Sequence, residues 1–133
     1  MILDASVLLA AFFPDEAQQP AQVLLRDHAA GRRRLKAPSL ILYETANAVW
    51  QAERRGRISS AQTEEILQAT AGLRIELHDL AWSECLPMAR QFQRSAYDAA
   101  YLALAYRFDE DMVTADERLY NAVRQRLKWV RLL

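Results

Sequence analysis

Four acidic residues interrupt apolar stretches of this chain, where a carboxylate has little structural reason to lie. They are Asp4, Glu44, Asp98 and Asp116. If the fold gathers them, each pair of charges repels by roughly 3–4 kcal/mol at about 4–5 Å and an effective dielectric constant near 20. A divalent cation removes that penalty, and hard cations prefer oxygen ligands. The acids therefore suggest a metal-dependent hydrolase.

Each acid also has a structural explanation. Asp4 and Asp116 each precede a predicted helix, where an aspartate accepts hydrogen bonds from the free amides of the first turn. Asp98 is the last residue of a capping-box pattern that begins at Ser95. Glu44 is harder to explain, because a buried carboxylate within an apolar helical stretch needs a partner. Pairing with an arginine is its structural alternative.

Three polar residues could support these acids. Ser6 and Thr114 flank two of them, and their hydroxyl groups could bind a carboxylate or a water molecule. Asn47 follows Glu44 by three residues, so the two share a helical face. We expect these three residues to surround the acidic site rather than to form it.

Short apolar runs alternate with longer helical patterns along the chain. Because parallel neighbours need crossover connections, this alternation predicts an α/β fold. The length predicts that residues 1–133 form a single domain. Strands are expected at 1–3, 35–37, 73–77, 112–114 and 128–130. Helices are expected at 5–12, 17–30, 39–55, 60–71, 81–94, 96–107 and 117–125. Gly31, Gly56 and Gly72 each follow a helical pattern and are interpreted as helix C-terminal caps.

This order predicts where the acids meet. In open parallel sheets, functional groups collect beyond the carboxyl ends of the strands. Asp4 and Asp116 follow the first and fourth predicted strands, and Glu44 and Asp98 lie near the starts of helices. All four can therefore point toward the same edge of the sheet.

Composition limits the partners and the compartment. The chain has 17 basic and 17 acidic residues, so any contact with nucleic acid must be local rather than driven by net charge. The single cysteine, Cys85, excludes an internal disulfide and fits a reducing compartment. No basic region precedes the first apolar run, and residues 7–13 are too few to span a bilayer. We expect a cytoplasmic protein without a membrane segment.

Four segments carry the acids, at residues 3–9, 38–47, 97–105 and 113–119. Their order and spacing, over essentially the whole chain, resemble PIN-domain ribonucleases, and in particular the VapC toxins of toxin–antitoxin pairs. The resemblance implies a three-layer α/β/α sandwich with a central, mostly parallel sheet of about five short strands.

The resemblance also implies a function. Asp4, Glu44, Asp98 and Asp116 would bind one or two Mg²⁺ or Mn²⁺ ions, with Asp4 and Asp98 as the principal ligands. A metal-activated water would then hydrolyse phosphodiester bonds of RNA. Relatives of this kind usually form homodimers. A cognate antitoxin commonly holds them inactive, and its tail covers the acidic groove, often with a basic side chain.

Other functional classes remain open at this point. A receiver-like phosphoacceptor domain also clusters acids at strand ends, but it has a second acid beside the first, which is missing next to Asp4. A metal-dependent phosphatase of the haloacid-dehalogenase type needs Asp-x-Asp, and here the third residue is Ser6. A non-catalytic PIN-like interaction module would not require all four carboxylates. Stabilisation by a cation together with RNA cleavage would distinguish the nuclease from this module.

Several large apolar residues exceed what a small core needs. They are Phe12, Phe13, Tyr43, Val49 and Trp50. Either they complete the core, or they line a contact with a second copy of the chain or with the antitoxin.

Overall fold

Five short parallel strands form the centre of the computed structural model, which describes all residues from 1 to 133. The strands lie in the order β3-β2-β1-β4-β5, and every neighbouring pair is parallel. They are β1 (Ile2–Leu3), β2 (Lys36–Pro38), β3 (Glu76–His78), β4 (Met112–Thr114) and β5 (Val130–Leu132).

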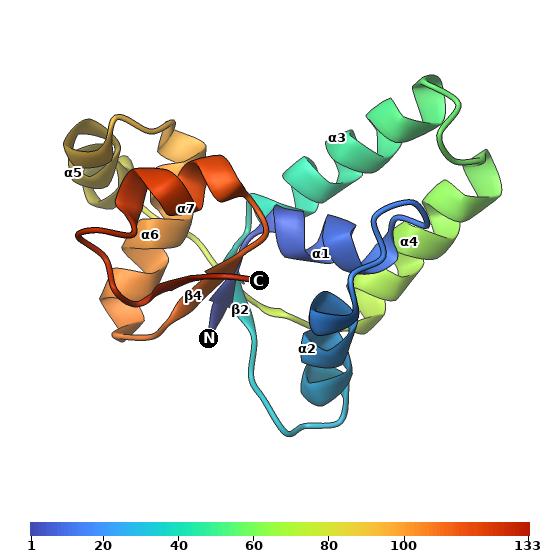
Figure 1. The fold of residues 1–133 in the computed structure, drawn as a ribbon, viewed down its shortest axis with the longest axis horizontal. Helices are drawn as coiled ribbons and strands as arrows, with labels where there is room; N and C mark the ends of the chain where they lie inside the picture. The colour runs from blue at the N-terminus through green and yellow to red at the C-terminus, as the bar shows by residue number, and fades with distance from the viewer.

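Seven helices connect the strands and cover both faces of the sheet. They are α1 (Ala5–Phe12), α2 (Gln19–Ala29), α3 (Ile41–Arg54), α4 (Ser60–Gly72), α5 (Trp82–Phe92), α6 (Ala96–Phe108) and α7 (Glu117–Val123). From β1 through β2 to β3, the chain moves toward one edge of the sheet. From β3 through β4 to β5, it moves toward the other edge. Right-handed crossovers therefore place α1 to α4 on one face and α5 to α7 on the other. Figure 1 shows this division, so the predicted three-layer α/β/α sandwich is confirmed.

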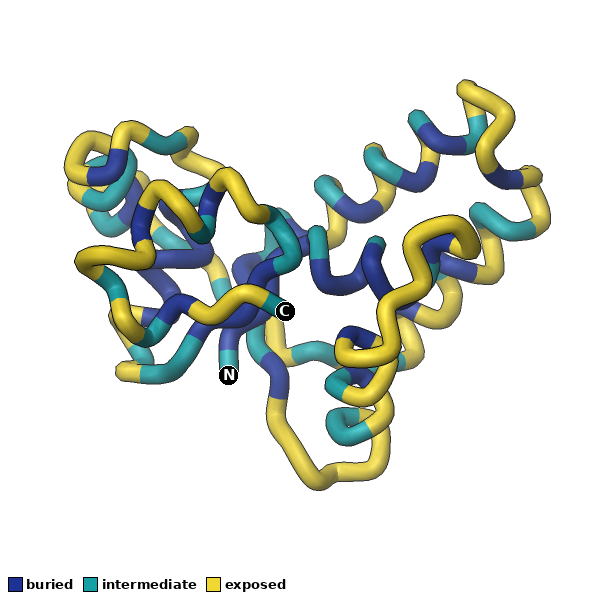
Figure 2. Tube along the Cα trace, in the orientation of Figure 1, coloured by how far each residue is buried: buried dark blue, intermediate teal, exposed yellow.

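The core lies where the central strands meet the helices, as the buried segments in Figure 2 show. Both residues of β1 are fully buried, which is typical of a parallel strand that is covered on two faces. Helix α6 contacts β1, β2 and β4 on one side and α5 on the other. Because it is enclosed in this way, every residue from 99 to 105 is buried. The single cysteine, Cys85, is also buried, as a small residue packed against α6.

Helices α3 and α4 extend away from the sheet as an arm (Figure 1). A separate apolar cluster holds the arm together, formed by Phe13, Val49, Ala52, Ile58 and Ile66. Phe13 and Val49 are therefore core residues. No helix in the structure has the length and apolar character needed to cross a bilayer.

The predicted helices agree with the structure to within a few residues, but one cap was wrong. Gly31 and Gly56 follow α2 and α3 with φ angles of +72° and +73°, the left-handed conformation expected of a cap. Gly72 is instead the last residue of α4. The left-handed residue after this helix is Arg74, at φ +52°, and it delays the start of β3 to Glu76.

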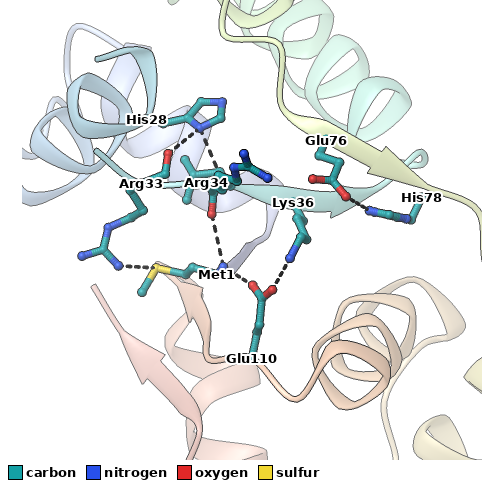
Figure 3. A network of polar contacts seen from close by, with 9 residues as sticks. Met1, His28, Arg33, Arg34, Lys36, Glu76, His78 and Glu110 are labelled. Carbon is teal, nitrogen blue, oxygen red and sulfur yellow. Dashed lines mark hydrogen bonds and ion pairs between the residues drawn. The ribbon is translucent and has the colours of Figure 1, made fainter. Parts of the chain in front are cut away.

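Charged groups join the amino-terminal edge of the sheet, shown in Figure 3. The carboxylate of Glu110, which precedes β4, accepts hydrogen bonds from the amine of Met1 and from Lys36 Nζ. These contacts connect the starts of β1, β2 and β4. Glu110 therefore has a structural role at this edge of the sheet. The four candidate acids lie at the opposite edge.

Candidate active site

All four candidate acids lie at the carboxyl-terminal edge of the sheet. Asp4 directly follows β1, and Asp116 lies two residues after β4. Glu44 is in the first turn of α3, which follows β2. Asp98 is in the first turn of α6. The structure therefore brings the four residues to one edge, as the predicted topology requires.

Asp4 is the only buried acid of the chain, and hydroxyl groups hold its carboxylate. Ser6 Oγ donates a hydrogen bond to Oδ1, and Thr114 Oγ1 donates to Oδ2 at 2.5 Å. The same hydroxyls accept hydrogen bonds from the backbone amides of Ala115 and Asp116, at 2.8 and 3.0 Å. Asp4 occupies the N-cap position of α1, but its carboxylate accepts no capping hydrogen bond from a backbone amide, so the capping explanation for this residue was wrong.

The surroundings of Asp4 disfavour its charge. Burial raises the pKa of Asp4 to about 6, and the negative charge of Asp116 also raises it. The hydrogen bonds from Ser6 and Thr114 lower this pKa but do not offset burial. No basic side chain forms an ion pair with Asp4. The site therefore combines a buried acid with a second acid nearby, and no basic side chain neutralises Asp4.

Glu44 is half-buried, and its partner is a tyrosine rather than an arginine. The hydroxyl of Tyr101 donates a hydrogen bond to Glu44 Oε1 at 3.0 Å. Burial raises the pKa of Glu44, the bond from Tyr101 lowers it, and the charge of Asp98 raises it. The predicted structural alternative, pairing with an arginine, was therefore wrong.

The hydroxyl of Tyr101 is affected by two of the acids. Burial, followed by the charges of Glu44 and Asp4, raises the pKa of Tyr101 well above its ordinary value. Of these two acids, Glu44 is the one that Tyr101 contacts directly. At neutral pH it stays protonated, and it can donate its hydrogen bond to Glu44.

Asp98 pairs with a basic residue in the short segment that joins α5 to α6. Arg94 contacts Asp98 Oδ2 through Nη2 at 2.8 Å and through Nε at 3.0 Å. Ser95 Oγ accepts a hydrogen bond from the Asp98 amide, as a cap should, but the carboxylate does not return to Ser95. Only half of the predicted capping box is therefore present. Arg94 is the only basic side chain paired with any of the four acids.

Asp116 does cap the helix that follows it. Its Oδ1 accepts hydrogen bonds from the amides of Arg118 and Leu119, at 2.8 and 3.2 Å. The structural explanation for this residue is correct. Its Oδ2 accepts no hydrogen bond within the chain, so one oxygen is left available at the sheet edge.

The four carboxylates do not form one compact group. Asp4 is affected by Asp116, and Glu44 by Asp98. No three acidic, histidine or cysteine side chains lie close enough together to hold a metal ion by themselves. The acids therefore provide hard oxygen donors at one edge of the sheet rather than a closed metal site.

The three predicted supporting residues have different surroundings. Ser6 and Thr114 contact Asp4 directly, whereas Asn47 is exposed and its side chain makes no hydrogen bond. Sequence reasoning missed Tyr101 and Arg94. The short separation of four residues could have indicated the pairing of Arg94 with Asp98, whereas the contact of Tyr101 with Glu44 joins distant segments.

Comparison with known proteins identifies relatives of this chain. A family model described as "PIN domain" matches residues 1–125. Ribonuclease VapC3 of Pyrobaculum aerophilum is 27% identical over 123 residues, covering 90% of this chain and 91% of that protein. Ribonuclease VapC9 of Mycobacterium tuberculosis is 31% identical over 127 residues, covering 90% and 87%.

A solved structure shows the same fold. The crystal structure of PAE2754 from Pyrobaculum aerophilum superposes with a TM-score of 0.71 at 24% identity, covering 91% of this chain and 77% of that one. The chain belongs to the PIN-domain family and, within it, to the group that includes the VapC ribonucleases.

Proposed function

We propose that this protein is a divalent-metal-dependent endoribonuclease of the VapC type, with its active site at Asp4, Glu44, Asp98 and Asp116. One observation carries the proposal. Asp4 is buried without a basic partner, beside a second acid, at the sheet edge where all four acids lie. Such an arrangement costs folding free energy unless a cation offsets the charges.

The donor atoms fit a hard divalent cation. The four acids provide only oxygen, which Mg²⁺ and Mn²⁺ prefer. Mg²⁺ usually keeps several waters and binds through one or two carboxylates, so the absence of a compact three-acid cluster is compatible with one or two ions. We propose that Asp4 and Asp98 hold the principal ion. Glu44 and Asp116 would complete its surroundings through water or hold a second ion.

When bound, such an ion supplies a Lewis acid that polarises the phosphodiester and lowers the pKa of water. The side chains of the site prepare for this chemistry. The hydroxyls of Ser6 and Thr114 fix both oxygens of Asp4 in place. Tyr101 holds Glu44 Oε1, which leaves Oε2 to accept a proton from the attacking water. Arg94 places a guanidinium beside Asp98, where it can bind a phosphate of the substrate.

The proposal includes a role as the toxin of a toxin–antitoxin pair, in the cytoplasm, as a homodimer that a cognate antitoxin inhibits. Exposed apolar side chains on the arm support a protein contact. Leu42, Tyr43 and Trp50 all lie on α3, and Tyr43 and Trp50 are 78% and 50% exposed. Large apolar side chains grouped on a surface often mark an interface.

Incubation of the purified protein with total RNA tests this function. Cleavage is expected with Mg²⁺ or Mn²⁺ and not with EDTA. Because a water attacks rather than a ribose hydroxyl, the products should carry 5′-phosphate and 3′-hydroxyl ends. Products with a 2′,3′-cyclic phosphate would contradict the mechanism. Thermal stabilisation by the ion without any cleavage would instead favour the non-catalytic interaction module.

A further inference from the structure

A cavity opens at the same edge of the sheet, beside the start of α6 where Asp98 lies. Its volume is about 430 Å³, within the range of small-ligand pockets. It lies between the segments that follow β2 and β3 and the first turns of α5 and α6. Tyr97 lines it, and the next residue along α6 is Asp98. The cavity therefore adjoins the acidic site along the first turn of α6.

Two aromatic side chains lie in the walls of this cavity with most of their surface exposed. Trp82, at the start of α5, is 76% exposed, and Tyr97, at the start of α6, is 67% exposed. Between them the lining is apolar, with Leu80 and the buried Cys85. The cavity is therefore suited to a flat, partly apolar group.

Two polar groups on the lining have no partner within the chain. The residues are Ser39 and Asp79, whose hydrogen bonds are made only by their backbone atoms. The third polar residue, His78, is already held by Glu76 at 2.7 Å and by an edge contact with Phe108. A hydroxyl and a carboxylate thus remain free to bind the edge of a ligand.

We propose that this cavity receives one unstacked base of the RNA strand, adjacent to the phosphate bound at the acids. Unstacked bases of single-stranded RNA stack on aromatic side chains and form hydrogen bonds through their edges. A carboxylate only accepts hydrogen bonds, and guanine presents two adjacent donors, N1–H and the N2 amino group. The cavity therefore prefers guanine to uracil. This inference rests on the proposed ribonuclease function and adds a specificity pocket to it.

Binding of short, fluorescently labelled single-stranded RNA tests the pocket, measured by anisotropy in the Asp98→Asn background so that the RNA stays intact. Trp82→Ala and Tyr97→Ala should each weaken the binding of a guanine-containing oligonucleotide by roughly 5- to 150-fold, the cost of one lost stacking contact. Tyr106→Ala is the matched control. Tyr106 is a 72% exposed aromatic residue on the same helix but outside this cavity, and its loss should leave the affinity unchanged.

Asp79→Asn tests the edge contact separately. It should reduce the preference for guanine over uracil at one position while the aromatic contact remains. If Trp82→Ala and Tyr97→Ala bind RNA as tightly as Tyr106→Ala, the inference is wrong. It is also wrong if Trp82→Ala changes the oligomeric state without changing RNA affinity, because the cavity would then be a subunit contact. Circular dichroism melts check that each variant is folded.

Cleavage assays separate this inference from the proposed function. A wild-type protein that cuts RNA, together with aromatic variants that cut the same sites with an unchanged KM, would refute the pocket alone. If the wild type cuts no RNA but the aromatic variants lose RNA binding, the pocket is supported and the catalytic function is refuted.

Discussion

Replacing Asp4 with asparagine tests whether the acidic site is destabilised without a metal. In the metal-free protein, burial raises the pKa of Asp4 to about 6, from an ordinary value of 3.8. At about 1.36 kcal/mol for each pH unit between these values, the ionised carboxylate lowers the free energy of unfolding by about 3 kcal/mol at pH 7. Asparagine has nearly the same shape and cannot ionise, so it removes this cost.

The pH dependence of the free energy of unfolding follows from proton binding at Asp4. Between pH 3.8 and about 6 the folded protein binds more protons at Asp4 than the unfolded chain does. The free energy of unfolding therefore falls as the pH rises through this window. The stabilisation from protonated Asp4 is complete below pH 3.8 and lost above pH 6.

The Asp4→Asn variant also loses one favourable hydrogen bond. The amide nitrogen of asparagine faces one of the two hydroxyls that donate to Asp4, and this mismatch costs about 1 kcal/mol at every pH. Asp4→Asn should thus be less stable than the wild type by about 1 kcal/mol in acid and more stable by about 2 kcal/mol at pH 7. The two stability curves should cross between about pH 4 and 5.

Urea denaturation in EDTA, from pH 4 to 8, measures both curves. Asp79→Asn is the matched control, because Asp79 is exposed and its curve should run parallel to that of the wild type. Addition of Mg²⁺ at pH 7 should stabilise the wild type more than Asp4→Asn. Parallel curves for Asp4→Asn and the wild type would refute the reasoning, because the buried carboxylate would then carry no cost.

Three further substitutions test other parts of the structure. Asp98→Asn should abolish RNA cleavage while the melting temperature stays within a few degrees of the wild type, because the charge is lost and the volume is kept; undiminished cleavage would remove Asp98 from the site. Tyr101→Phe should destabilise the fold by about 1–2 kcal/mol in urea and slow cleavage, since the half-buried Glu44 loses its only hydrogen-bond donor. An unchanged rate would show that Tyr101 does not position Glu44. Glu110→Gln should cost about 1 kcal/mol at pH 7. Glu110 is partly buried, which raises its pKa, but its bonds to Lys36 and the terminal amine lower the pKa overall, so this contribution should disappear as the pH falls below the ordinary value of 4.5. An equal loss at pH 3 and pH 7 would contradict that account.

Local sequence patterns determined the fold class and the helix boundaries of this protein. The alternation of short apolar runs with helical periods predicted the α/β class, and the seven helices have nearly the predicted boundaries. These features follow from periodicity and connection length, which involve residues that are close in sequence. The common edge for the acids followed as well, because the carboxyl ends of parallel strands share one edge.

Only the tertiary structure decided which groups the acids contact. The bond between Tyr101 and Glu44 joins residues 57 positions apart, and that between Thr114 and Asp4 joins residues 110 apart. No local pattern encodes such pairs.

The same holds for burial along the arm. Val49 and Trp50 are neighbours on α3, yet the first is buried and the second is 50% exposed. The reason is that α4 and the end of α1 cover only one face of this helix. Which residues are apolar is determined by the sequence, but which of them remain available for a partner depends on how the helices pack.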